Sequence, residues 1–117
     1  MPAALEQKVE VVGVGQLRSR IGAYRDRVGE GGIIGVRDGL RLCGYLIPRD
    51  ALPQTLLEKA EQTRVSSSFT TTMSGAAFAH WRRSNVPIWL YHQRRHKGWF
   101  VPEKFADSLP IAERTAS

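Results

Sequence analysis

The basic segment 92–97, which reads His-Gln-Arg-Arg-His-Lys, holds the residues with the most obvious chemical potential. Two histidines beside arginines could act as acid and base on a phosphodiester, as in a ribonuclease. His92 and His96 are also four residues apart, a spacing that brings two side chains together on a helix but not in the turn predicted here. No carboxylate or thiolate lies close in sequence to complete a metal site. We therefore expect neither catalysis nor a metal, and favour a solvated turn or one that touches phosphate.

Arginine is the second source of possible chemistry, because its planar guanidinium binds phosphate and guanine through two parallel hydrogen bonds. The chain of 117 residues has 17 Lys and Arg against 11 Asp and Glu, a formal net charge of +6. This balance favours nucleic acid as the partner. The glycine-rich segment 29–32 follows a predicted helix, whereas a phosphate-binding loop precedes one, so we expect no nucleotide cofactor.

Composition and hydropathy indicate a soluble chain of single-domain size. Its 42% hydrophobic residues can fill a modest core without disulfides. Cys43 is the single cysteine and lies in the apolar run 42–47, so we expect a small buried side chain. The sequence has no stretch of ~18 apolar residues and no signal-peptide pattern at its start, which predicts a cytoplasmic protein without a membrane partner.

The first predicted elements are a strand and a helix. Residues 9–14 are rich in valine and form a short strand that stops at Gly15, which can cap the helix that follows. Residues 16–28 carry apolar side chains at intervals of four, three and four, which is one face of an α-helix. The glycines of segment 29–32 end this helix, since glycine adopts the left-handed conformation that other residues resist.

A hairpin and a second helix follow. The apolar runs 33–37 and 41–47 flank Asp38-Gly39-Leu40, and Asp-Gly between such runs is a strong hairpin signal. Pro53 suits the first turn of a helix that continues to about Arg64. Residues 1–65 are therefore predicted to be an α+β unit with the order strand, helix, hairpin, helix.

Residues 66–117 are predicted to contain a degenerate second copy of this unit. Ser66, Ser67 and Ser68 are interpreted as a linker, and Ser74 as the cap of a helix. Phe78 and Trp81 follow Ile21 and Tyr24 by 57 positions, and the segment 98–102 follows 44–48 by 54 positions. We expect a second hairpin over residues 87–101, and a structure without it would reject the repeat.

Four segments of the first half resemble the Phd/YefM family of antitoxins from type II toxin-antitoxin systems. They are Val14-Gly15-Gln16-Leu17-Arg18, Val28-Gly29-Glu30-Gly31, Val36-Arg37-Asp38-Gly39 and Gly44-Tyr45-Leu46-Ile47-Pro48, in this order. The resemblance implies a non-enzymatic protein whose N-terminal unit forms a homodimer, binds operator DNA and represses its own operon. It also implies that the C-terminal segment inactivates a cognate toxin.

The same resemblance implies that DNA is contacted by Arg18, early in the helix, and by Arg37, at the end of the first hairpin strand. Such residues can reach a groove or a phosphate, and a two-fold protein would bind a palindrome. The alternative is that these arginines are solvated surface charges. With the supporting positions, the candidate DNA-binding residues are Arg18, Arg37, Arg20, Arg41, Arg94 and Arg95.

The C-terminal region departs from the family pattern. Toxin-binding segments in this family are commonly mobile and often acidic, whereas residues 69–105 carry three tryptophans in a basic background, which suggests a folded segment. A basic surface would also repel a basic toxin. The alternatives are a pseudo-dimer within one chain, an extended DNA-binding surface, and a stand-alone repressor without toxin binding.

A single-stranded nucleic-acid binder is the remaining alternative. Trp89, Tyr91, Trp99 and Phe100 could serve as stacking platforms beside the basic turn. Trp89 and Tyr91 are two residues apart and are expected on the same strand face, where they either form a platform or fill the core. We favour the core.

Overall fold

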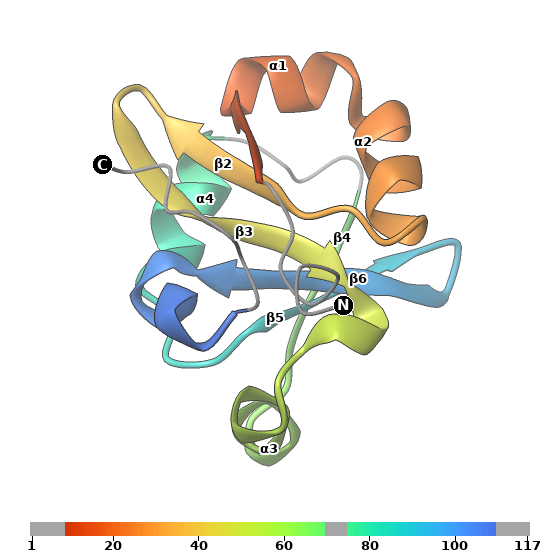
Figure 1. Ribbon diagram of the computed structural model, residues 1–117, viewed down its shortest axis with the longest axis vertical. Helices are drawn as coiled ribbons and strands as arrows, with labels where there is room; N and C mark the ends of the chain where they lie inside the picture. Colours follow the sequence, from red (N-terminus) through yellow and green to blue (C-terminus); the bar gives the residue numbers. More distant parts are fainter. Residues whose placement is uncertain (1–8, 70–74, 110–117) are drawn as a thin grey trace, which may run out of the picture.

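The computed structural model of the chain describes residues 9–69 and 75–109 as an α+β fold with six strands in one mixed sheet. The strands, in the sheet order β1-β2-β3-β6-β5-β4, are β1 (Glu10–Gly13), β2 (Ile34–Asp38), β3 (Arg41–Pro48), β6 (Arg95–Pro102), β5 (Ile88–His92) and β4 (Val65–Ser68) (Figure 1). The helices are α1 (Val14–Ser19), α2 (Ile21–Gly29), α3 (Gln54–Gln62) and α4 (Gly75–Trp81), with the 3-10 helices η2 (Arg49–Ala51) and η3 (Glu103–Ser108).

The two halves of the sheet repeat one another. In each half a short strand runs parallel to the first strand of an antiparallel hairpin. The pairs of the second hairpin repeat those of the first 54 positions later, so that Ile34 opposite Leu46 becomes Ile88 opposite Phe100. Both hairpins also have a register shift at the same place, after Val36 and after Leu90. The expected second hairpin is therefore present.

An approximate two-fold axis lies between β3 and β6, which pair in antiparallel fashion across the middle of the sheet. Gly44 lies opposite Pro102 and Pro48 lies opposite Gly98, and the shift of 54 positions exchanges these two pairs. A Cβ on Gly44 would lie 2.3 Å from the Val101 carbonyl oxygen. Both glycines are thus required by the close approach of the central strands, since a Cβ on Gly98 would lie 2.5 Å from the equivalent oxygen of Ile47.

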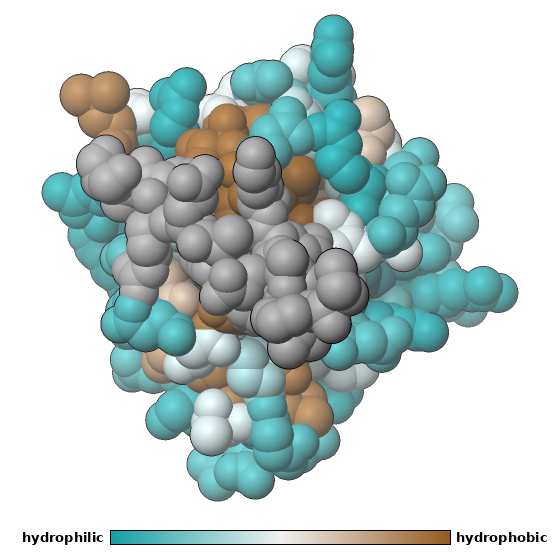
Figure 2. Space-filling view, viewed as in Figure 1, coloured by the Kyte–Doolittle hydropathy of each residue, from teal (hydrophilic) through white to brown (hydrophobic). Residues whose placement is uncertain are grey.

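The core has two layers, one on each face of the sheet. Alternation along β3 and β6 sends Leu46 and Phe100 to the face covered by α1, α2 and α4, and their neighbours to the face covered by α3 and η3. Hydrophobic residues gather around the middle of this second face, and hydrophilic residues dominate its rim (Figure 2). The fully buried large side chains are Tyr45, Phe69, Phe78, Phe100, Leu17, Ile34, Leu46, Ile47, Leu56, Ile88 and Leu90.

The single helix expected over residues 16–28 is wrong, because two helices, α1 and α2, occupy this segment. The chain leaves the helical conformation at Arg20, where φ is −131° and ψ is 36°. The first helix also starts earlier than expected, at Val14, with Gly13 rather than Gly15 as its N-cap. The break lets Leu17 of α1 and Tyr24 of α2 both reach the core although the two helices differ in direction (Figure 1).

The linker expected at Ser66–Ser68 is also wrong. These serines belong to β4, which pairs in parallel with β5 from Val65 opposite Ile88 to Ser68 opposite Tyr91. Ser74, the expected cap of the next helix, lies outside the described residues, but α4 follows and buries Phe78 and Trp81 as the repeat predicted. Among the residues that the structure describes, no helix is long and apolar enough to cross a membrane.

Candidate nucleic-acid interface

Two of the predicted DNA-binding residues, Arg37 and Arg41, come together at the tip of the first hairpin. Both are exposed. The Arg37 Nη1 donates a hydrogen bond to the Gly39 carbonyl oxygen over 2.9 Å, which ties the side chain to its own turn. Gly39 has a φ of +64°, a conformation that glycine adopts without strain. Arg41 lies opposite Asp38 across the hairpin.

Arg18 and Arg20 are exposed residues at the junction of α1 and α2. β1 and β2 end side by side, with Gly13 opposite Arg37, and α1 begins directly after Gly13. The helix that carries Arg18 therefore starts at the same end of the sheet as the first hairpin tip. Arg20 terminates α1, where its backbone N–H is bonded to the carbonyl oxygens of Gln16 and Leu17.

Arg94 and Arg95 are exposed at the tip of the second hairpin. Gln93 and Arg94 both have a positive φ, +51° and +66°, as a two-residue turn of this hand requires. The tip lies against the C-terminal part of α2, where a shallow cavity is lined by Arg25, Asp26, Gly29, Glu30, His92 and Lys97. Partial burial and the charges of Arg25 and Lys97 lower the pKa of His92.

The two hairpin tips lie at opposite ends of the sheet (Figure 1). β3 and β6 run antiparallel, so the start of β3 at Arg41 lies past the end of β6, and the start of β6 at Arg95 lies past the end of β3. At about 3.3 Å per residue, this stagger separates the two tips by roughly 30 Å along the strands. The molecule measures 38 × 31 × 25 Å, which agrees with this spacing.

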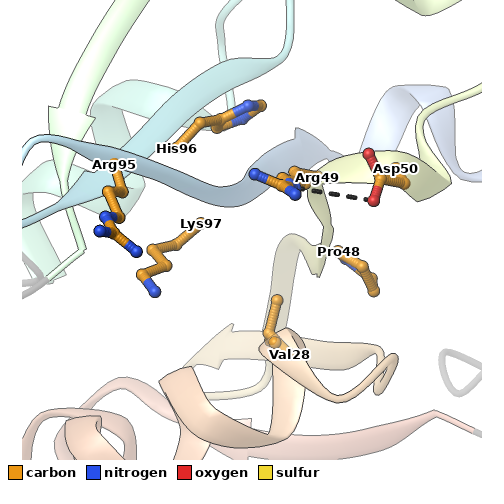
Figure 3. Close-up of a pocket in the computed structure, with 8 residues that line it drawn as sticks. Val28, Pro48, Arg49, Asp50, Arg95, His96 and Lys97 are labelled. Carbon is orange, nitrogen blue, oxygen red and sulfur yellow. Dashed lines mark ion pairs between the residues drawn. The ribbon is translucent and has the colours of Figure 1, made fainter.

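A larger basic cavity, which we call the second-hairpin cavity, lies between β6, η2 and the end of α2. Its volume is about 330 Å³, and its lining residues are Val28, Gly29, Pro48, Arg49, Asp50, Arg95, His96 and Lys97 (Figure 3). Arg95 and Lys97 extend side by side from β6, and Arg49 stands across from them with Asp50 on its far side. Arg49 and Asp50 form an exposed ion pair with an Nε to Oδ2 distance of 3.6 Å.

The two histidines of the basic segment do not act as a pair. His92 lies beside Arg25 of α2, whereas the His96 ring is stacked on Trp89 with 3.6 Å between ring centroids. The His96 Nε2 lies 2.9 Å from the Gly98 carbonyl oxygen, and burial lowers the pKa of His96. Among the described residues, no three His, Cys, Asp or Glu side chains come together as a metal site would require.

The core position expected for Trp89 and Tyr91 is only partly confirmed, because the sheet register shifts between Leu90 and Tyr91 and Tyr91 is exposed. Phe100 and Trp99 are buried, and the Trp99 Nε1 donates to the Arg49 carbonyl oxygen over 3.0 Å. Trp89 is half-buried, with the Arg64 guanidinium 4.0 Å from its ring centroid. Tyr91 is exposed, and it is the one large aromatic side chain that is exposed among the described residues of this hairpin.

Cys43 is buried, as its apolar surroundings predicted. Burial, together with the nearby Asp38 carboxylate, raises the pKa of its thiol. The thiolate form that a reactive cysteine needs is therefore disfavoured.

Sequence reasoning missed Arg25 and Arg49 as members of the basic surface. Arg25 belongs to α2, and Arg49 follows the proline that ends β3. The signal available was the repeat itself, because the residues after Pro48 must lie beside the start of β6 once β3 and β6 pair. No family model matches the chain, and searches of curated proteins and of solved structures also give no match.

Proposed function

We propose that the protein binds double-stranded operator DNA and represses its own operon, as do the Phd/YefM antitoxins that its first half resembles in sequence. The observation that supports this most is the pair of arginine-bearing hairpin tips at opposite ends of one two-fold sheet. Their separation of roughly 30 Å is close to one turn of the DNA helix, about 34–36 Å, which separates two successive half-sites. Exposed arginine at both tips suits contact with phosphate and with base edges.

One chain is proposed to supply both halves of the DNA-binding body. In a two-fold dimer each protomer contributes the same surface, and the repeat within this chain provides two related surfaces without a second copy. The central strands β3 and β6 already pair with each other. The resemblance implies a homodimer instead, which stays a prediction. A homodimer would place two chains on the DNA where this proposal places one.

Neutralisation of a cognate toxin is proposed as the second part of the antitoxin role. A stand-alone DNA-binding repressor is the alternative, and one observation favours it: β4, β5 and β6 belong to the same sheet as the first half and do not form a separate arm. Residues 110–117 lie outside the described residues. Both functions place the protein in the cytoplasm, where its operator would be.

Fluorescence anisotropy on a labelled duplex tests the proposed function. The duplex is taken from the region upstream of the protein's own gene, and a scrambled duplex of the same length is the control. We expect sequence-selective binding that weakens steeply with salt, with Arg18→Ala and Arg37→Ala both weakening it. Equal binding to both duplexes, or variants that bind as the wild type does, would reject the DNA function.

A further inference from the structure

The second-hairpin cavity has a counterpart beside the first hairpin. The counterpart cavity has a volume of about 280 Å³ and is lined by Arg41, Leu42, Cys43, Arg82, Glu103 and Lys104. The five residues from β3 and η3 correspond to lining residues of the second-hairpin cavity through the shift of 54 positions that relates the strands, and the sixth, Arg82, follows α4 as Val28 and Gly29 belong to α2. The two cavities are therefore the same feature of the fold, built twice with different side chains.

The two cavities each have three cations and one carboxylate in their lining, but the carboxylate stands in a different place. Arg95 corresponds to Arg41, but Lys97 corresponds to the buried thiol of Cys43. Arg49 corresponds to Glu103, so a carboxylate stands in the counterpart where the second-hairpin cavity has a guanidinium. The acid of the second-hairpin cavity, Asp50, corresponds to Lys104, whose Nζ donates to the Arg83 carbonyl oxygen and to the Asn85 Oδ1. The counterpart thus has its carboxylate at the position of Arg49, where the second-hairpin cavity has a cation.

The cations of the second-hairpin cavity are available to a ligand. Among the described residues, the ion pairs join Arg27 to Glu10 and Arg49 to Asp50, and neither Arg95 nor Lys97 takes part in one. Asp50 lies on the far side of Arg49 from the two β6 side chains (Figure 3). Arg95 and Lys97 repel each other because they lie side by side without a carboxylate partner among the described residues, and an anion placed between them and Arg49 relieves this repulsion.

We propose that the second-hairpin cavity binds a phosphate group through Arg49, Arg95 and Lys97, and that its counterpart does not. The ligand is a phosphodiester of the DNA backbone or a small phosphorylated molecule, since both present the same oxyanion to the three cations. A volume of about 330 Å³ is at the small end of ligand-binding pockets, which suits a phosphate with little attached to it. The inference does not depend on the proposed operator binding.

Isothermal titration calorimetry of the full chain with inorganic pyrophosphate, at low salt, tests the site. We expect saturable binding of about one pyrophosphate per chain, and about tenfold weaker binding for Lys97→Ala and for Arg95→Gln, as loss of a charge-assisted hydrogen bond implies. Lys97→Arg keeps the charge and should bind as the wild type does. If the Lys97→Ala protein fails to fold, Lys97→Arg and Arg95→Gln still test the site, because Arg95 is exposed and its substitution does not disturb the core.

Lys104→Ala is the matched control, because it removes one lysine from the counterpart cavity and changes the net charge by the same amount. It should leave pyrophosphate binding unchanged. The proposal is wrong if the wild type shows no saturable binding, or if Lys104→Ala weakens binding as much as Lys97→Ala does, which would mean that net charge alone attracts the ligand.

A duplex competition then identifies the source of the phosphate. If it is the DNA backbone, pyrophosphate displaces the duplex and Lys97→Ala lowers the salt dependence of duplex binding by about one counterion. If it is a free ligand, pyrophosphate and duplex bind to the protein at the same time. Lys97→Ala then weakens pyrophosphate binding and leaves duplex binding unchanged. Either result supports the site. Failure to bind pyrophosphate would leave selective duplex binding through Arg18 and Arg37 untouched, so the two proposals can fail separately.

Discussion

The N-terminal half, residues 10–48, and the C-terminal half, residues 65–102, share a backbone plan but differ in the residues that face solvent. Strand directions, hairpin register and the position of the register shift are the same in both halves. The hairpin tips have diverged: Arg37 corresponds to Tyr91, and the fully exposed Leu40 corresponds to Arg94. The helices differ too, since α1 packs on β1 and β2, α2 packs on β3 and β6, and α4 lies behind β2 and β3 (Figure 1).

This comparison separates what the fold requires from what a function can change. Gly44 and Gly98 lie in close contact with the opposite strand, so a side chain at either position would strain the centre of the sheet. Residues at the tips and in the cavities touch few neighbours, so they can acquire different charges at little cost in stability. We therefore expect the central strands to respond alike to substitution and the two tips to respond differently.

The largest expected effect on stability comes from removing the contacts between aromatic rings, which only the second half makes among the described residues. Phe100 is fully buried, and its ring centroid lies 5.3 Å from that of Phe78 and 5.7 Å from that of Trp81. Phe100→Ala should lower the free energy of unfolding by about 3–5 kcal/mol. Leu46→Ala, at the equivalent position, should cost less because it removes no ring contact. Urea denaturation measures both, and a greater loss for Leu46→Ala would contradict the comparison.

The central glycines should show that both halves carry the same steric constraint. Gly44→Ala and Gly98→Ala each place a Cβ within about 2.5 Å of a backbone oxygen, and overpacking of this kind costs about 3 kcal/mol. Gly15→Ala is the control, because a Cβ there meets nothing within 4 Å and alanine favours the helix. Thermal denaturation should rank Gly15→Ala as the most stable of the three. A Gly98→Ala variant as stable as the wild type would show that Gly44 and Gly98 are not under the same steric constraint.

The two tips carry their arginines at different positions, so the equivalent positions Arg37 and Tyr91 should differ in DNA binding. Arg37→Ala should weaken binding to the operator duplex by about 1–3 kcal/mol, since it removes a contact to a base edge or to phosphate. Tyr91→Ala, at the equivalent position of the second hairpin, removes no charge and should leave the affinity within about threefold. Anisotropy titrations at one salt concentration measure both variants, and equal losses would show that the charge of Arg37 is not what distinguishes the two positions.

The smallest expected effect is a pH dependence present only in the second half, where His96 stands in the position of Leu42. Burial lowers the pKa of His96 below the value of 6.5 expected in the unfolded chain. The unfolded chain therefore takes up a proton first as the pH falls, so this group weakens the fold from about pH 6.5 downward, and its destabilising effect is absent at higher pH.

His96→Leu should reduce this acid destabilisation. Unfolding free energies compared at about pH 7.5 and about pH 5.5 should fall more steeply for the wild type than for the variant. His92 titrates in both proteins, so its contribution cancels in the difference. A steeper fall for the variant would show that His96 is not the group responsible.

Much of the fold could be predicted from the sequence. The hairpins were predictable because Asp38-Gly39 marks a turn and because the segment 98–102 repeats 44–48. The break at Arg20 was not, since Leu17, Ile21 and Tyr24 keep a helical spacing across it. β4 was hidden for another reason: three consecutive serines lack the apolar alternation of a strand, and their conformation depends on pairing with β5, which is distant in sequence.

The candidate site was only partly predictable. Arginines next to a turn signal, such as Arg37, Arg94 and Arg95, are found at exposed hairpin tips without knowledge of the packing. The second-hairpin cavity combines side chains from α2, η2 and β6, and its members, such as Arg49 and Lys97, are far apart in the chain. Only the pairing of β3 with β6 brings them together, so local patterns could not reveal this cavity.

The stoichiometry of the complex with DNA tests most directly whether one chain acts as a two-fold body. Native mass spectrometry of the full chain bound to its operator duplex gives this number without any substitution. The account predicts one chain per duplex at saturation, with both hairpin tips of that chain on the same DNA. Two chains per duplex would contradict it and would favour the homodimer that the sequence resemblance implies.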